Sequence, residues 1–386
     1  MSTPRRTALL VSLLALLAVF APPANAETAV PQGFRPASTS WTGRDTGYVL
    51  GYSPCAGSWC PALVGTTDGG RHWRRLGTPP MPLPDNHNHV SLTFVGDRVA
   101  YVSDGVHLRT SRDGGASWHP VGLVGAREPY YLSKIAETGG RVFAVLTTYG
   151  EGRGSTRLYS AAAGSPVLVP VPGFAVTGSL TYGDLAVGGG LQVALGADYG
   201  TEKYWTSRDG VRFTPADPPC PAGSVAALAG VRDRQVVALC SGSPGSPQPG
   251  STERRLRHAP RLGGTFSGGD AAPFTGITQA FGAASPTSAT VAAVGGGTGF
   301  LHSTTDGGRT WTTTVLSERG LGLADLDFPG GGTGVVVDGQ PDADGGSAVY
   351  RTTDGGIHWR EVAIGENALA DEALRPGSLG EPHVVV

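Results

Sequence analysis

The sequence predicts an all-β fold, a seven-bladed β-propeller of four-stranded antiparallel blades. A turn motif of the form Ser/Thr-x-Asp-Gly-Gly-x-x-Trp recurs along the chain, with a hydrophobic strand-like run before and after each copy. The copies are about 45 residues apart, or about twice that, which is the length of a propeller blade. The chain has 61 Gly and 30 Pro among 386 residues, and a repeat architecture uses such residues in its many turns.

Each copy of the motif predicts a tight hairpin turn. The Asp carboxylate accepts hydrogen bonds from downstream backbone N–H groups, the Gly pair supplies positive φ, and the aromatic ring packs between neighbouring sheets. We therefore expect a structural role for the motif, because the same carboxylate recurs in each unit. The Asp and aromatic positions are Asp68 and Trp73, Asp113 and Trp118, Asp209 and Phe213 (a shortened copy), Asp306 and Trp311, and Asp354 and Trp359.

The spacing of the motif aromatics gives the number of blades. The first gap is 45 residues and the last is 48, whereas the two gaps between them are 95 and 98. Each long gap predicts one blade without the motif, so the total is seven. The strands predicted in these two blades are Tyr131–Thr138, Arg141–Tyr149, Ser155–Ser160 and Val167–Val171, and then Val225–Gly230, Gln235–Leu239, Thr252–His258 and Gly264–Ser267.

The motif resembles the Asp-box, or BNR, repeat of sialidase-like β-propellers. This group includes sialidases, xyloglucan-type glycosidases, sortilin-type receptors and photosystem II assembly-factor propellers. The resemblance implies that each box joins the third and fourth strands of a blade. It also implies that the boxes lie on the face away from any catalytic pocket. Fold follows strongly from this likeness and activity only weakly.

A sialidase makes further demands on the sequence. That family uses three Arg for the substrate carboxylate, a Tyr–Glu pair as nucleophile and an Asp as acid/base. Its first Arg stands in a Phe/Tyr-Arg-Ile-Pro motif, whereas Phe34-Arg35-Pro36 lacks the Ile. Glu128 lies close to Tyr130, without a second feature that assigns it a role.

The amino terminus predicts an export signal. Residues 1–26 combine Arg5 and Arg6 with the apolar run Ala8–Phe20 and a small-x-small site ending at Ala26. The general and the twin-arginine export routes both stay open. We expect a secreted or extracytoplasmic protein with an N-terminal segment at 27–37, the propeller at 38–364 and a tail at 365–386. No later stretch is long and apolar enough for a membrane span.

The charge balance argues against nucleic-acid binding. Removing the two Arg of the leader leaves 27 basic against 31 acidic residues, a net charge of −4, with no basic stripe for phosphates.

The four cysteines predict two disulfides, since their number is even and the chain is expected to be exported. Of the three possible pairings, Cys55–Cys60 with Cys220–Cys240 is favoured. Cys220 and Cys240 flank one predicted hairpin, which brings them together. A zinc site is the alternative, but the spacing and the lack of nearby His argue against it.

Loops on the face opposite the boxes supply the candidate binding residues. One group is Asp85, His87 and His89, whose two His are metal-capable; no third ligand is identifiable, so we predict no metal site. The other two groups place Tyr and carboxylates on neighbouring blades. They are Tyr149, Glu151 and Arg153, and Asp198, Tyr199 and Glu202.

The sequence favours a non-catalytic binding or assembly module for a glycan, a cell-wall component or a protein. We expect it to be monomeric and to need no cofactor. The alternative is a glycoside hydrolase of the exo-α-sialidase type. The two hypotheses differ in what the box-free face must contain: an enzyme needs three convergent Arg beside a Tyr–Glu pair and an Asp.

Overall fold

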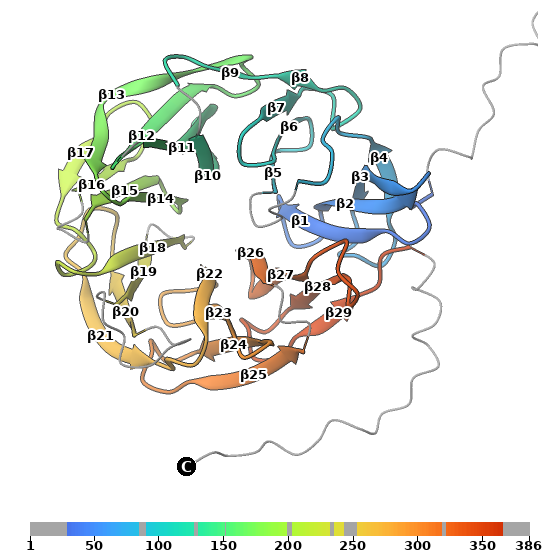
Figure 1. Cartoon of the computed structure of the whole chain (residues 1–386). Coiled ribbons are helices and arrows are strands. Elements are labelled where there is room, and N and C mark those ends of the chain that lie inside the picture. The colour runs from blue at the N-terminus through green and yellow to red at the C-terminus, as the bar shows by residue number, and fades with distance from the viewer. Residues whose placement is uncertain are drawn as a thin grey trace, which may run out of the picture.

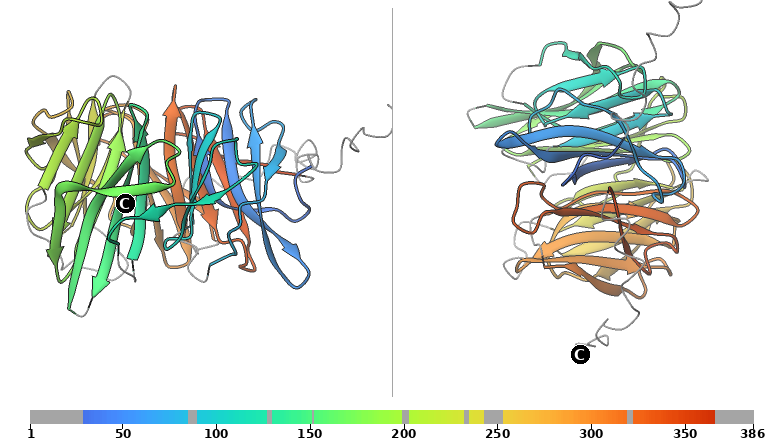
Figure 2. Two further views of the ribbon diagram at one scale, coloured as in Figure 1. Left: turned by 90° about the horizontal axis from the view of Figure 1, so that it is seen from above. Right: turned by 90° about the vertical axis from the view of Figure 1, so that its right-hand side faces the viewer.

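The computed structural model is a ring of seven β-sheets around a central channel (Figure 1). It describes residues 29–84, 90–126, 130–150, 152–198, 203–231, 235–242, 253–318 and 322–365. Seen from the edge, the ring is a disc whose blades stand side by side (Figure 2). The predicted fold class is confirmed. No helix among the described residues is long and apolar enough to cross a membrane.

Each blade pairs four consecutive strands in antiparallel order, with its first strand next to the channel. The strands of blades 1 to 3 are β1 Arg35–Trp41, β2 Gly47–Cys55, β3 Ser58–Thr66, β4 Arg74–Gly77, β5 Ser91–Val95, β6 Val99–Ser103, β7 Leu108–Ser111, β8 His119–Pro120, β10 Tyr130–Thr138, β11 Arg141–Gly150, β12 Arg153–Ala162 and β13 Val167–Gly178. The short strand β9 (Gly122–Leu123) adds to the edge of blade 3, parallel to β13.

Blades 4 to 7 follow the same plan. Their strands are β14 Thr181–Val187, β15 Leu191–Ala197, β16 Lys203–Ser207, β17 Thr214–Ala216, β18 Val225–Gly230, β19 Val236–Ser241, β20 Arg254–Ala259, β21 Ser267–Ala272, β22 Ile277–Ala283, β23 Ala289–Gly295, β24 Thr298–Thr304, β25 Thr312–Ser317, β26 Leu323–Gly330, β27 Thr333–Gly339, β28 Ser347–Thr352 and β29 Arg360–Val362.

The two blades without the motif stand where the spacing predicts them, as blades 3 and 5. One strand prediction is wrong: the last strand of blade 5 runs over Ser267–Ala272 rather than Gly264–Ser267. Arg261 and Gly264 instead close a turn, in which the Gly264 N–H donates to the Arg261 carbonyl at 2.9 Å. Gly263 has a φ of +72°, which suits a turn and not a strand.

The five Asp-Gly turns, which we call the box turns, connect the third and fourth strands of blades 1, 2, 4, 6 and 7. In the first, Asp68 Oδ1 accepts from the backbone N–H of Arg71 at 3.1 Å and of His72 at 3.0 Å. The Thr66 hydroxyl donates to the same oxygen at 2.8 Å and accepts from the Gly70 N–H at 3.0 Å. These four bonds lie within the motif, and the Gly69 N–H also ties the turn to the Asp45 carbonyl at 2.8 Å.

The indole N–H of each motif Trp also bonds its own turn. Trp73 donates to the Gly70 carbonyl at 3.0 Å, and the three other Trp repeat this bond at the same length. Each ring then packs at the seam with the preceding blade. Trp311, for example, contacts the cluster of Leu256 and Phe281 between blades 5 and 6. Phe213 occupies the corresponding place in blade 4 without an N–H to donate.

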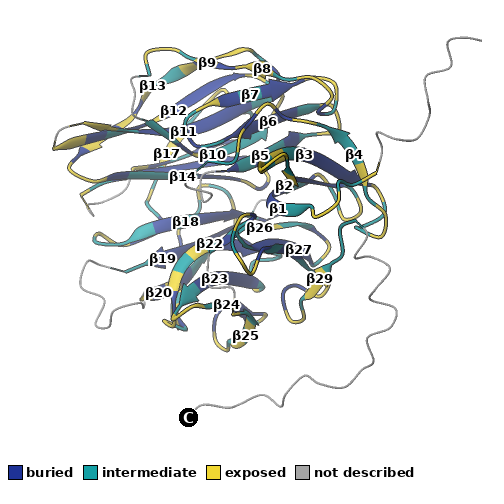
Figure 3. Cartoon of the chain, turned by 45° about the vertical axis from the view of Figure 1, so that its right-hand side comes forward, coloured by how far each residue is buried: buried dark blue, intermediate teal, exposed yellow. Residues whose placement is uncertain are grey.

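Most of the core consists of the middle strands, which are buried nearly throughout (Figure 3). The strand β19 is typical, since Val236 to Leu239 are fully buried. The blades bury both faces of their sheets against neighbours, so these strands read as continuous apolar runs. Both predicted disulfides are present, with Cα–Cα separations of 5.8 Å for Cys55–Cys60 and 5.4 Å for Cys220–Cys240.

The ring closes by side-chain packing and hydrogen bonds between blades 7 and 1, because each of them contains its own four strands. Val49 and Val64 of blade 1 pack on Val337 and Val349 of blade 7. Ser38 Oγ and Thr39 N, on β1, donate to Asp325 of β26. Residues 366–386, which include most of the predicted tail, lie outside the described residues.

Candidate functional site

The central channel contains a cavity of about 870 Å³. Residues of blades 2 to 7 line it, most of them on the innermost strands. The lining includes the first residues of β5 and β26 and the last part of β11, all of which lie at the face opposite the box turns. We call this the box-free face. Its polar lining residues are Ser91, Tyr131, Ser133, Lys134, Thr147, Tyr149, Asp184, Gln279 and Asp325.

Irregular strands aim several of these side chains. The inner strands β1, β10, β22 and β26 each carry a register shift against their neighbour. A β-bulge leaves a residue unpaired and redirects its side chain. Ser133, Gln279 and Asp325 are the residues at three of these shifts, and all three line the cavity. The register shifts therefore place three polar side chains in the lining of the cavity.

An ion pair joins blades 3 and 4 across the channel wall. Lys134 Nζ lies 2.9 Å from Asp184 Oδ1. The Asp184 carboxylate also accepts from its neighbour Leu185 N–H at 2.8 Å and from the Leu228 N–H of blade 5 at 2.7 Å. Asp184 consequently ties three blades together at the cavity.

Asp325 is the most unusual carboxylate of the channel. Its φ of +53° is a left-handed conformation that few residues other than Gly adopt. Its Oδ2 accepts from Ser38 Oγ and from the Thr39 N–H at 2.8 Å. Burial raises the pKa of Asp325 to about 6, against the lowering effect of these two hydrogen bonds, and the charge of Asp327 acts in the same direction as burial.

Asp327 lies two residues further along the same strand. Desolvation of its carboxylate by the surrounding protein raises its pKa. The charge of Lys134 lowers the pKa of both Asp325 and Asp327. One ammonium group therefore faces three carboxylates.

Two tyrosines stand at the mouth of the cavity. Tyr131 of β10 and Tyr149 of β11 make an edge-to-face contact with ring centroids 5.4 Å apart. Tyr149 is 46% exposed. Such a pair offers both an apolar surface and hydroxyl groups to a ligand.

Of the predicted candidates that the structure describes, Tyr149 lines the cavity. Arg153 lines a smaller hollow of about 420 Å³ beside it, together with Tyr149. Asp198 instead holds a turn: its Oδ1 accepts from Ser179 Oγ at 2.5 Å and from the Leu180 N–H at 2.9 Å. These bonds lower its pKa. The remaining candidates lie outside the described residues; they are Asp85, His87, His89, Glu151, Tyr199 and Glu202.

Sequence reasoning missed Lys134, Asp184 and Asp325. The signal was a charge inside an apolar strand, which is costly unless it is paired or placed at a channel. Lys134 is also one of only two lysines in the chain. All three lie within strands, whereas the predicted candidates came from loops of the box-free face.

The arginines that an acid-binding site would need are absent from the cavity lining that the structure describes. Arg35 instead donates to the carbonyls of Pro341 at 2.7 Å and Ala343 at 2.9 Å, and so joins blade 1 to blade 7. Three arginines do line one hollow, at the seam of blades 7 and 1 beside the box turns. They are Arg71, Arg351 and Arg360, which line a hollow of about 490 Å³ on the wrong face for the channel.

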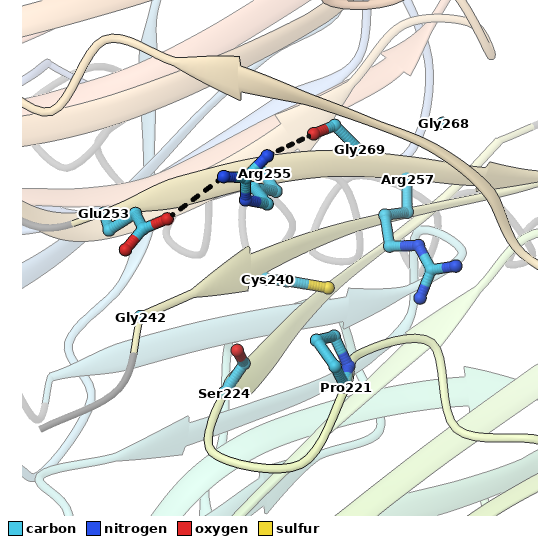
Figure 4. Close-up of a pocket in the computed structure, with 9 residues that line it drawn as sticks. All are labelled: Pro221, Ser224, Cys240, Gly242, Glu253, Arg255, Arg257, Gly268 and Gly269. Carbon is cyan, nitrogen blue, oxygen red and sulfur yellow. Dashed lines mark hydrogen bonds and ion pairs between the residues drawn. The ribbon is translucent and has the colours of Figure 1, made fainter.

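A third hollow, of about 500 Å³, lies on blade 5 beside the disulfide residue Cys240 (Figure 4). Its two arginines are already bonded. Arg255 donates to the Gly269 carbonyl at 2.9 Å and pairs with Glu253 at 3.3 Å. Arg257 donates to the carbonyls of Pro219 at 2.7 Å and Phe266 at 3.0 Å. These contacts account for both side chains as supports of the blade. Among the described residues, no group of His, Cys, Asp and Glu is arranged to hold a metal ion.

No protein-family model matches the chain, and no curated protein matches it. Several solved structures are distantly similar to this chain over most of its length. "YCF48 bound to D1 peptide" has 15% identity and a TM-score of 0.45 over 80% of this chain and 90% of its own. A PL25 ulvan lyase bound to its saccharide has 10% identity and a TM-score of 0.48 over 89% and 92%. The GH74 enzyme of Niastella koreensis has 11% and 0.30 over 85% and 78%. Likenesses this distant carry no argument about function.

Proposed function

We propose that this protein is an exported, non-catalytic binding module that takes its ligand at the mouth of the central channel. The glycan, cell-wall or protein partner predicted from sequence would dock on the box-free face. The observation that carries the proposal is the cavity of about 870 Å³, with its hydroxyl, amide, carboxylate and ammonium groups and its two tyrosines. Binding sites combine an enclosed space with a few fixed polar groups in this way. Export is part of the proposal, and the two disulfides fit an oxidising compartment.

A blocked channel tests the proposal. Gln279 is exposed and stands at the register shift of β22, so Gln279→Trp places an indole in the cavity. Val211→Trp is the matched control, because Val211 is 67% exposed on a box turn. Calorimetric titration with peptidoglycan fragments, neutral and charged oligosaccharides and short peptides identifies a ligand. We expect the channel variant to lose binding by at least about tenfold and the control to retain it. Equal binding by both variants would refute the channel as the site.

A glycoside hydrolase is the second candidate, and Asp325 is the observation that favours it. A carboxylic acid whose pKa is raised to about 6 has the property of a general acid. Asp184 lines the same cavity, and hydrolysis of a glycoside uses two carboxyl groups. Turnover of fluorogenic sialosides and other aryl glycosides, lost in Asp325→Asn, would establish the enzyme.

A further inference from the structure

The charges of the cavity do not balance among the described residues. Lys134 is its one cationic lining residue, whereas Asp184 and Asp325 both line it and Asp327 lies further along β26. Paired charges in a partly enclosed site are tolerated, but an unpaired carboxylate is costly. The site therefore has capacity for a further cation.

The ion pair does not supply that cation to Asp325. Lys134 is engaged by Asp184 at 2.9 Å. Ser38 and Thr39 both donate to Oδ2 of Asp325. In the described part of the chain, no protein group donates to its other oxygen, Oδ1. That oxygen belongs to a residue that lines the cavity and stays partly accessible.

Exposed apolar residues also stand on the same face. The links between blades run across the box-free face, because each leads from an outer strand to the next inner strand. Leu180, just before β14, is 38% exposed, and Phe274, just before β22, is 59% exposed. Ile277, the first residue of β22, is 51% exposed. Together with Tyr149 they give this face exposed apolar groups on several blades, which a protein segment lying across the channel mouth would cover.

We propose that the ligand of the channel is a protein segment that inserts a basic side chain toward Asp325 while its apolar neighbours rest on the blade links. This inference rests on the proposed function and gives the class of its partner. An arginine fits best, since its planar guanidinium bonds a carboxylate and also stacks on a tyrosine ring. A neutral sugar leaves Asp325 uncompensated, and an anionic one is repelled by it.

Four probes separate these partners. They are the capped tripeptide Phe-Arg-Phe, its analogue with citrulline in place of the arginine, chitosan tetrasaccharide with its primary amines, and N-acetylchitotetraose. Citrulline keeps the size and hydrogen bonding of arginine and loses its charge. Calorimetry at pH 7.5 and low salt should show the arginine peptide binding at least about tenfold tighter than the citrulline peptide. Added salt should weaken the arginine peptide more than the citrulline peptide.

Two substitutions should move the affinity of the arginine peptide in opposite directions. Asp325→Asn keeps an oxygen for Ser38 and Thr39 but removes the charge, so we expect a loss of about tenfold. Lys134→Met removes a like charge and frees Asp184, so we expect a gain of several fold. Asp344→Asn is the control: it removes the same charge from an exposed loop between β27 and β28, outside the cavity. Thermal melts check that all three fold.

The outcomes separate this inference from the proposed function. Equal binding of the arginine and citrulline peptides, no binding by either, or an unchanged affinity in Asp325→Asn overturns the basic-segment inference. Tighter binding by the chitosan tetrasaccharide than by the arginine peptide assigns the channel to an amino sugar and also overturns it. In each of these cases a ligand that Gln279→Trp excludes would still support the channel as a binding site.

Discussion

The aspartates of the box turns and those of the channel show how differently one side chain behaves in two regions of this molecule. Asp113, on a box turn, accepts from the hydroxyl and the backbone N–H of Ser117 at 2.5 and 2.9 Å. These bonds lower its pKa to about 2. Asp325, in the channel, has a pKa raised to about 6 because burial outweighs its hydrogen bonds. The box carboxylates stabilise the fold as anions. Ionisation of the channel carboxylate instead destabilises the fold, because burial disfavours its charge.

The two regions also differ in where their partners stand along the chain. A box Asp bonds residues within four positions of itself. Asp325 bonds residues 286 and 287 positions away, on the first blade. We infer that the box turns form as local units of the scaffold and that the channel site exists only when the ring is closed.

The largest effect on stability should come from replacing one aromatic residue by Ala in each region. Trp311→Ala removes a ring packed between blades 5 and 6 and its bond to Gly308, and it should lower the free energy of unfolding by about 3 kcal/mol. Tyr131→Ala should lower it much less, because Tyr131 is only partly buried and lines the channel cavity. Urea denaturation measures both.

Ligand titration of the same two variants tests whether the scaffold and the site are separate. Trp311→Ala should bind the channel ligand like the unaltered chain at a temperature where both are folded, whereas Tyr131→Ala should bind it weakly. Reduced binding in Trp311→Ala without unfolding would show that the scaffold and the site are not separate.

The fold could be predicted because the bonds of the box turns are local in the sequence. The turn chemistry of residues such as Asp68 and Gly70 lies within a few positions, so one sequence contains it whole, and its period gives the number of blades. Even blades 3 and 5 were located by the gaps that they fill. The start of β21 was misplaced because Gly263 and Gly264 make a turn whose conformation the apolar pattern does not encode.

The site was predictable only in part. Tyr149 was found because it ends a strand at a loop of the box-free face. Asp184 and Asp325 depend on which inner strands become neighbours around the ring and on bulges that redirect side chains. Such features arise from tertiary contacts, so neither composition nor spacing contains them. The predicted role of Asp198 as a ligand group did not anticipate its bonds to Ser179 and Leu180.

Asp325→Asn should remove part of the pH dependence of stability. A carboxyl whose folded pKa is about 6, above its ordinary 3.8, stabilises the folded state below about pH 4, and this contribution is lost as the pH rises through 6. Lys134 and Asp327 also face this group, and both residues are unchanged in the variant. We expect the variant to gain about 2 kcal/mol on the unaltered chain between pH 4 and 7, measured by urea denaturation. A difference that stays constant over this range would contradict the raised pKa.

The smallest effect belongs to the exposed box carboxylates, and it should have the opposite sign. Because the pKa of Asp113 is lowered from 3.8 to about 2, its contribution to stability is present above pH 4 and is lost as the pH falls toward 2. Asp113→Asn keeps one acceptor oxygen but not the charge, so it should destabilise the chain at pH 7 by less than about 1 kcal/mol after solvent screening. The difference from the unaltered chain should become small near pH 2, where the Asp is protonated in the unfolded state and about half protonated in the folded state. If the two melting temperatures stay equally far apart at pH 7 and pH 2, the anion is not what holds the turn, and the contrast between box and channel aspartates reduces to one of position.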